Sequence, residues 1–86
     1  MNKFSIIIPS FNSIKTLPFT LGSIKSQNYK NYEVIIIDDC SSDNHDYDKF
    51  LSFIDDLTII KNSQNKGPTF SKNIGIKKSK GNIICF

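Results

Sequence analysis

Several residue types and patterns are scarce or missing in this 86-residue sequence. It has no tryptophan, one histidine and two cysteines. No apolar run approaches the ~20 residues needed to span a bilayer, and residues 1–3 lead into a β-branched run, so we expect neither a membrane span nor a signal peptide. Cys40 and Cys85 lack metal-ligand spacing, and we expect both to be small buried thiols in a reducing compartment. His45 lies in a predicted surface turn, where we expect it to be solvated.

Common phosphate-binding signatures are also missing. The sequence has no G-x-G-x-x-G after its first apolar run and no G-x-x-x-x-G-K-[ST] motif, which argues against a dinucleotide-dependent dehydrogenase and a P-loop NTPase. The net charge is only +3, and the one lysine cluster, residues 72–80, is typical of a solvated helix face. We therefore expect no nucleic acid partner.

The strongest positive feature is the stretch from Glu33 to Asp43. Four β-branched residues, 34–37, form a run typical of a strand buried on both faces, and Asp38 and Asp39 follow at once. Because an unpaired buried carboxylate is costly, we expect these two acids at the rim where the strand ends. In open parallel sheets this rim binds ligands. A pair of acids that satisfies helix N-terminal N–H groups is an equally good local interpretation.

Strand-like and helix-like segments alternate along the chain. We predict strands over 4–8, 32–37, 57–60 and 82–86, and expect Pro9 to end the first one because proline cannot donate to a ladder. Helices are predicted from 14–16 to 27, from 42–44 to 55, and from 67–68 to about 80. This order predicts an α/β fold, an open parallel sheet of about four strands with helices on both faces, as a single domain over 1–86. The chain stops inside its last apolar run, so we expect a piece of a longer protein.

Individual residues support the three helices. Thr16 is the expected N-cap of the first helix, with Pro18 in its first turn, and its apolar stripe is formed by Leu17, Leu21 and Ile24. The second helix is expected to bury Phe50, Leu51 and Ile54. Gly75, inside the third helix, suggests close packing on the sheet.

Four segments taken together resemble the family 2 glycosyltransferases of the GT-A fold. The matching segments are residues 5–12, 21–29, 32–43 and 65–75, followed by 80–86. The resemblance implies the Rossmann-like, nucleotide-binding half of a GT-A fold. It also implies an inverting enzyme that transfers a sugar from a nucleotide-sugar, commonly a UDP-sugar, to an acceptor hydroxyl in glycan or surface polysaccharide synthesis.

The resemblance assigns nucleotide contacts residue by residue. In this family the acid matched by Asp39 accepts a hydrogen bond from the base, and its preference for an imide N–H favours uracil over cytosine. Phe11 stands where many relatives have Tyr, and Lys72 stands where Arg is usual, which keeps the charge but loses the bidentate fork. The implied nucleotide-binding residues are Pro9, Phe11, Asn12, Asp39, Gly67 and Lys72.

The resemblance also implies a metal and partners. In the family the strand matched by 82–86 leads into an Asp-x-Asp motif that holds Mg²⁺ or Mn²⁺, so we expect that motif beyond Phe86, no metal ligand within 1–86, and no transfer by these residues alone. The expected acceptor is a saccharide or a lipid-linked saccharide. The expected location is the cytoplasm, at the inner face of the membrane. We also expect the chain to self-associate through the truncated edge of its sheet. Two alternatives stay open: a non-catalytic Rossmann-like nucleotide-binding module, and a receiver-type signalling domain phosphorylated on Asp38 or Asp39.

Overall fold

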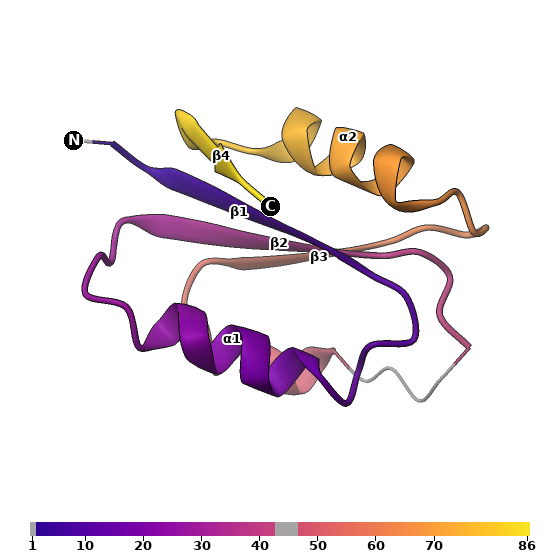
Figure 1. Ribbon diagram of the computed structural model, residues 1–86, viewed down its shortest axis with the longest axis horizontal. Coiled ribbons are helices and arrows are strands. Elements are labelled where there is room, and N and C mark those ends of the chain that lie inside the picture. The colour runs from indigo at the N-terminus through magenta and orange to yellow at the C-terminus, as the bar shows by residue number, and fades with distance from the viewer. Residues whose placement is uncertain (1, 43–46) are drawn as a thin grey trace.

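The computed structural model describes residues 2–42 and 47–86. Its sheet contains four parallel strands in the order β3-β2-β1-β4. Helix α1 and the 3₁₀ helix η1 cover one face and helix α2 covers the other (Figure 1). This arrangement confirms the predicted α/β fold. The elements are β1 (Phe4–Ser10), α1 (Leu17–Lys25), β2 (Tyr32–Asp38), η1 (Asp48–Phe50), β3 (Leu57–Lys61), α2 (Pro68–Lys78) and β4 (Ile83–Cys85).

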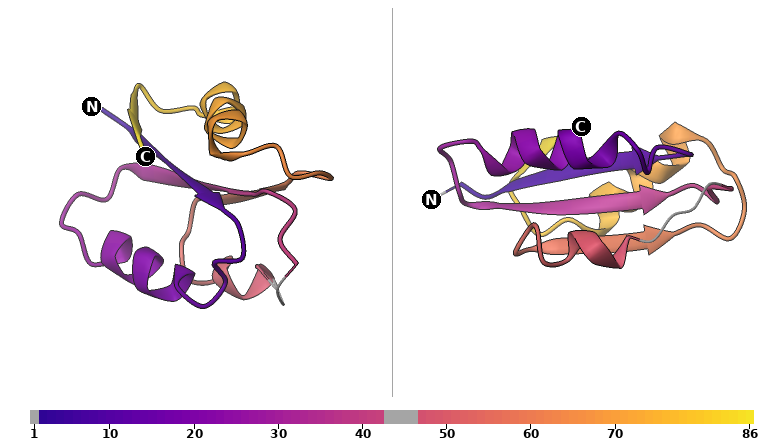
Figure 2. Two further views of the ribbon diagram at one scale, coloured as in Figure 1. Left: turned by 45° about the vertical axis from the view of Figure 1, so that its right-hand side comes forward. Right: turned by 90° about the horizontal axis from the view of Figure 1, so that it is seen from below.

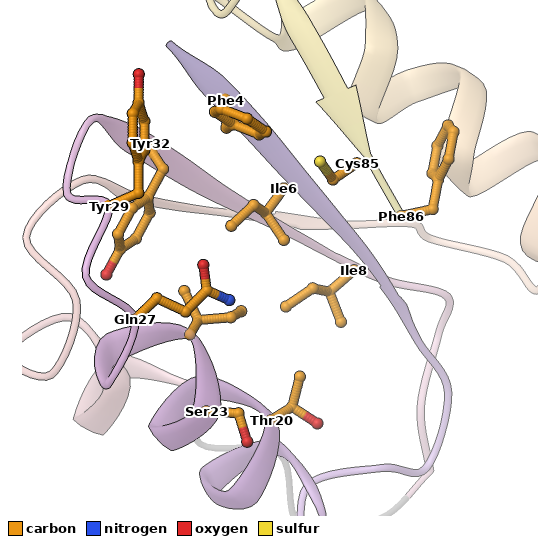
Figure 3. Close-up of a pocket in the computed structure, with 11 residues that line it drawn as sticks. Phe4, Ile6, Ile8, Thr20, Ser23, Gln27, Tyr29, Tyr32, Cys85 and Phe86 are labelled. Carbon is orange, nitrogen blue, oxygen red and sulfur yellow. The ribbon is translucent and has the colours of Figure 1, made fainter. Parts of the chain in front are cut away.

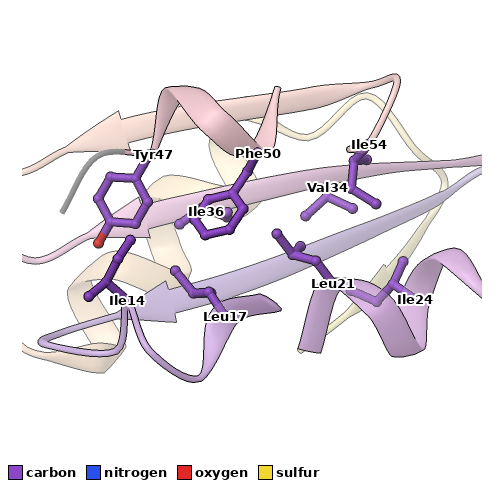
Figure 4. Packing of buried hydrophobic residues seen from close by; sticks show 9 residues of the cluster. All are labelled: Ile14, Leu17, Leu21, Ile24, Val34, Ile36, Tyr47, Phe50 and Ile54. Carbon is purple, nitrogen blue, oxygen red and sulfur yellow. The ribbon is translucent and has the colours of Figure 1, made fainter. Parts of the chain in front are cut away.

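The apolar run of β2 forms the centre of the molecule. Residues 34–37 are 0–1% exposed, and alternate side chains point to opposite faces of the sheet. Val34 and Ile36 pack with α1 and the η1 region, while Ile35 and Ile37 join Ile7 under α2. Figure 4 shows the larger cluster, in which the predicted stripe of α1 faces the sheet; its members are Ile14, Leu17, Leu21, Ile24, Val34, Ile36, Tyr47, Phe50 and Ile54.

Pro9 does not end β1, contrary to the prediction. The strand continues to Ser10, and Pro9 pairs in register with Ile37. Along a strand, the backbone N–H and C=O groups of successive residues point alternately toward the two neighbouring strands. The carbonyl of Lys3 accepts from the start of β4, and the carbonyl of Ser10 accepts from Asp39 at the end of β2, which fixes this alternation along β1. The nitrogen of Pro9 therefore points toward the β4 side. Since β4 pairs only with residues 4–6 of β1, the missing N–H breaks no ladder bond there.

The predicted second helix is wrong over its described part. Only Asp48–Phe50 is helical, as a single 3₁₀ turn, and turns follow it. Phe50 and Ile54 are buried as predicted, but Leu51 is 50% exposed. Serine, asparagine and aspartate dominate the preceding segment, and these residues hydrogen-bond to nearby backbone in non-helical conformations. The candidate caps Asp43 and Asn44, and the turn with His45, lie outside the described residues.

The ends of the two α-helices agree more closely with the sequence. Thr16 is the N-cap residue of α1 and Pro18 lies in its first turn, but the Thr16 hydroxyl donates to the Ser13 carbonyl and makes no side-chain cap. Gly67, with a φ of 88°, is the N-cap of α2. Cys40 is exposed, contrary to prediction, and Cys85 is half-buried. No helix in the described ranges is both long and apolar enough to cross a membrane.

A buried carboxylate fixes β4 at the amino end of the sheet. Glu33 is 1% exposed, and its Oε2 accepts hydrogen bonds from Ser5 Oγ at 2.6 Å and from the backbone N–H groups of Lys80 and Gly81. Gly81 lies too close to β1 for a side chain, since a Cβ there would stand 2.6 Å from the Lys3 carbonyl oxygen. These contacts hold the start of β4 against β1, far from the edge where the two aspartates lie.

Candidate functional site

Three loops meet at the carboxyl edge of the sheet, and a cavity of about 200 Å³ lies between them. The loops follow β1, β2 and β3, as expected for a parallel sheet in which all strands end at one edge. Four residues that the sequence singled out come together here. The cavity is lined by Pro9, Ser10, Phe11, Asp39, Asn65, Gly67, Pro68 and Ser71.

Asp39 is the one acidic or basic residue among the described residues that line this cavity. It lies at the rim of the sheet, as predicted, but its side chain is buried there, with only 5% of the residue exposed. Its Oδ1 accepts from Asn62 Nδ2 at 2.9 Å and from the Lys66 N–H at 2.7 Å, and its Oδ2 accepts from the Gly67 N–H at 2.8 Å. Burial raises the pKa of Asp39, but these three hydrogen bonds and the nearby Lys66 charge outweigh it, so the pKa lies below its ordinary value.

The two oxygens of Asp39 differ in how much acceptor capacity they have left. A carboxylate oxygen accepts about two hydrogen bonds. Oδ1 already has two protein donors, whereas Oδ2 has only the Gly67 N–H among the bonds of the described residues. An ionised acceptor with spare capacity, in a residue that lines the cavity, is suited to a ligand that donates a single N–H or O–H. The bonds that fix the carboxylate also fix the direction in which Oδ2 points.

Asp38 has a different role from its neighbour. It is 2% exposed, and its Oδ1 accepts hydrogen bonds from Tyr47 Oη at 2.9 Å and from Ser41 Oγ. Burial, helped by the Asp38 carboxylate, raises the pKa of Tyr47, which therefore stays a neutral donor. Asp38 thus ties the η1 region to the end of β2. Of the two aspartates, only Asp39 lines the cavity at this edge.

Asn12 and Lys72 do not line the cavity. Asn12 has a φ of 52°, its backbone N–H donates to Ser41 Oγ at 2.9 Å, and its side-chain oxygen accepts from the Ser42 N–H at 2.8 Å. It therefore joins the loop after β1 to the loop after β2. Lys72 lies on α2, with its Nζ 5.3 Å from the centre of the Phe86 ring. The predicted nucleotide contacts of both residues stay predictions.

Sequence reasoning missed two polar residues that build the site. Asn62 donates to both Asp39 and the Ser71 hydroxyl, at 2.9 and 3.2 Å, and Ser71 is completely buried. Asn62 directly follows β3, so its place at a strand's carboxyl end was the available signal. Nothing in the sequence distinguishes Ser71 from a serine on an exposed helix face.

A larger cavity, of about 510 Å³, lies on the α1 side of β1 and β4. Figure 3 shows that apolar side chains of β1, β4 and the segment after α1 surround it. None of its lining residues carries a charge, so no ionised side chain is available there to orient a small substrate. Its lining residues are Phe4, Ile6, Ile8, Thr20, Ser23, Ile24, Gln27, Tyr29, Tyr32, Cys85 and Phe86.

A divalent metal does not fit the residues that the structure describes. No group of three or more His, Cys, Asp or Glu side chains in residues 2–42 and 47–86 is placed to hold an ion. The two carboxylates at the carboxyl edge are already engaged by protein donors. We therefore assign no metal-dependent step to these side chains.

Comparisons with known proteins agree on one family. The sequence model described as "Glycosyl transferase family 2" matches residues 5–86. A similar curated protein is the UDP-Glc:alpha-D-GlcNAc-diphosphoundecaprenol beta-1,3-glucosyltransferase WfaP of Escherichia coli, which is 41% identical over all of this chain and 34% of its own length.

Two solved structures share the fold. Residues 1–349 of Staphylococcus aureus TarS in complex with UDP superpose with a TM-score of 0.86 at 31% identity, over 95% of this chain and 25% of that one. GalNAc-T7 with UDP, GalNAc and Mn²⁺ gives a TM-score of 0.81 at 25% identity, over 98% of this chain and 17% of that one. The chain spans 12 to 34% of the lengths of the curated relatives first matched.

Proposed function

Because the chain belongs to glycosyltransferase family 2, we propose that it binds the nucleotide of a UDP-sugar donor in the cavity at the carboxyl edge of the sheet. The open acceptor position on Asp39 Oδ2 is the observation that carries this proposal. The imide N3–H of uracil is a single donor that matches it. Cytosine has no hydrogen on N3 and would place a lone pair against the carboxylate.

The size and lining of the cavity support binding of a base. About 200 Å³ is below the ~300 Å³ of the smallest drug-sized pockets, so it suits one planar base better than a whole nucleotide-sugar. Phe11, 49% exposed, offers a ring face on one side, and Pro9 lies beside it. The ribose and diphosphate would then extend out of the cavity, and Lys72 is the residue that we expect to approach their charge.

The rest of the proposed reaction concerns a longer protein. The E. coli relative is named for a diphosphoundecaprenol-linked acceptor, so we propose transfer to a hydroxyl of a lipid-linked saccharide in surface polysaccharide synthesis, at the cytoplasmic face of a membrane. GalNAc-T7 was solved with Mn²⁺. The described residues offer no such site, so the proposal places Mg²⁺ or Mn²⁺ on an Asp-x-Asp motif that would follow Phe86.

An NMR titration tests the nucleotide site directly. ¹⁵N-labelled chain is titrated with UDP and with CDP, which carries the same diphosphate and differs only in the base. We expect UDP to shift the amide signals of Ser10, Phe11, Asp39 and Gly67, and CDP to shift them at least tenfold less at equal concentration, because one hydrogen bond to a charged group contributes about 1.5–3 kcal/mol.

Variants separate binding from folding in this titration. Asp39→Asn should lose the preference for UDP, whereas Asp55→Asn, at an exposed position, should keep it. Since Asp39 also holds its own loop, Phe11→Ala is the second variant: its exposed side chain can be removed without unfolding, and UDP binding should weaken. Equal shifts with UDP and CDP, or UDP binding unchanged in both Asp39→Asn and Phe11→Ala, would contradict the proposal.

A further inference from the structure

The outer surface of α1 and η1 exposes large apolar side chains. Phe19 is 79% exposed, on the side of α1 opposite the buried residues Leu17 and Leu21. Leu51 is 50% exposed and Phe53 37% exposed, both just after η1. Single exposed apolar residues are common on soluble proteins, but these three belong to α1 and to the segment after η1, which cover the same face of the sheet.

Two lysines of this surface lie beside aromatic rings, one exposed and one buried. Lys25 Nζ lies 4.6 Å from the centre of the Phe53 ring, and Lys49 Nζ lies 5.3 Å from that of Phe50. A shallow cavity of about 280 Å³, lined by Pro18, Lys49, Phe50 and Phe53, joins the two elements. Figure 2, in the view from below, shows α1 and η1 on the same face of the sheet. We call this surface, made of Phe19, Lys25, Lys49, Leu51 and Phe53, the α1–η1 face.

We propose that the α1–η1 face docks on the surface of an anionic lipid bilayer. Phenylalanine and leucine side chains with lysines around them are the composition of segments that lie at the boundary between headgroups and acyl chains. Lysine can keep its ammonium among lipid phosphates while its carbon stem covers apolar surface. A protein partner fits less well, because lysine is depleted at the centres of protein interfaces.

The charge of the surrounding surface limits the strength of this docking. Asp48 lies within η1, and Asp55 and Asp56 line a neighbouring cavity together with Lys25 and the Asp56-paired Lys3. The excess of positive charge is therefore small, and neither the lysines nor the apolar side chains suffice alone. Docking should need both, and it should weaken as salt screens the lysines. No residue of the α1–η1 face lines the cavity around Asp39, so docking does not depend on the proposed nucleotide site.

Vesicle co-sedimentation tests the proposal with the full 86-residue chain. The probes are vesicles of phosphatidylcholine alone and vesicles of phosphatidylcholine and phosphatidylglycerol in equal parts. We expect binding to the anionic vesicles only. Each lysine near such a surface contributes roughly a fivefold factor in affinity, so Lys25→Glu/Lys49→Glu should lower partitioning at least tenfold. Phe19→Ser/Leu51→Ser should lower it severalfold without loss of fold, because both side chains are exposed.

The matched control reverses the same charges on the other face of the sheet. Lys77 and Lys78 are exposed in the last turn of α2, and Lys77→Glu/Lys78→Glu should bind anionic vesicles nearly as well as the wild type. No binding to anionic vesicles would overturn the proposal. An equal loss in the two charge-reversal variants would overturn it too, because binding would then follow net charge rather than this face. Circular dichroism of each variant confirms that it is folded.

Discussion

At the scale of single residues, the ionisation of Asp39 links the candidate site to the stability of the fold. Its carboxylate accepts three hydrogen bonds from the loop between β3 and α2, and its folded pKa lies below the ordinary value. The stabilisation is complete above the pKa of an unfolded aspartate, about 3.9, and is lost as the pH falls through the lower folded pKa. The same bonds that orient Oδ2 therefore stabilise the domain at neutral pH.

This linkage predicts a pH-dependent difference between two proteins. The free energy of unfolding of the wild type should exceed that of Asp39→Asn at about pH 6. The difference should shrink as the pH is lowered toward about 3, because below about 3.9 the aspartate of the unfolded chain is protonated while the folded carboxylate still resists protonation. Urea unfolding at several pH values measures it. Asp55→Asn controls for the loss of one negative charge at an exposed position. A difference that does not change with pH would mean that the hydrogen bonds to Asp39 do not favour its charged form.

The positions of the site residues could be predicted from the sequence, but their hydrogen-bond partners could not. Asp39 and Gly67 could be placed at one edge because strand ends and helix starts are recognisable from local patterns. The partner of a buried carboxylate is not a local property. Asn62 and Tyr47 reach the two aspartates only after β3 and η1 pack beside β2. The sequence therefore predicted that two acids lie at the edge, but not that each would be buried with its own donors.

At the scale of secondary-structure elements, α2 is the element whose contact with the sheet is most restrictive. The helix passes over β1 and β2 at Gly75, where an added Cβ would overlap Ile7 Cγ2 and stand 3.0 Å from Ile37 Cδ1. Helix propensity alone favours alanine over glycine by about 1 kcal/mol. Packing must therefore decide the outcome of a substitution here.

Two glycine-to-alanine substitutions compare propensity with packing. Gly75→Ala should lower the free energy of unfolding by about 1–3 kcal/mol, since overpacking forces the helix away from the sheet. Gly22→Ala, in α1 with nothing within 4 Å of the new Cβ, should raise it by about 0.5–1 kcal/mol. Urea unfolding of both variants measures whether each substitution lowers or raises the free energy of unfolding. A stabilising Gly75→Ala would show that α2 packs less tightly than described.

The elements differ in how well local patterns predict them. Strand β2 and helix α1 follow their apolar periodicity within a few residues, and the ends of α2 follow its proline and glycine signals. The face that α2 buries is formed by Ser71 and Gly75, whereas Phe70, expected on its apolar side, is 44% exposed. The region of η1 does not, although Tyr47, Phe50 and Ile54 keep a helical spacing and are all buried. There the burial of three side chains is achieved by turns, because residues with poor helix propensity precede them. Pro9 was misplaced because the extent of pairing between β1 and β4 is a tertiary property.

At the scale of the whole molecule, apolar surface is distributed unevenly between the two sides of β1. On one side β2 and β3 complete the sheet, while on the other β4 pairs with only three residues of β1. The apolar cavity of about 510 Å³ adjoins β4, and Phe86 beside it is 64% exposed. In the part of the chain that the structure describes, no strand pairs with the outer edge of β4. An open edge beside an apolar cavity favours pairing with a second copy.

We therefore predict that the 86-residue chain self-associates through β4. Sedimentation velocity over a range of concentrations should show a weight-average mass that rises from monomer toward dimer. Phe86→Ser should shift this transition to at least tenfold higher concentration, because burying an aromatic side chain contributes about 1.5–3 kcal/mol. Phe19→Ser, which removes an exposed aromatic side chain from α1 instead, should leave the transition in place. A monomer at every concentration would contradict the prediction, and an equal effect of the two substitutions would assign the association to general hydrophobicity rather than to the β4 edge.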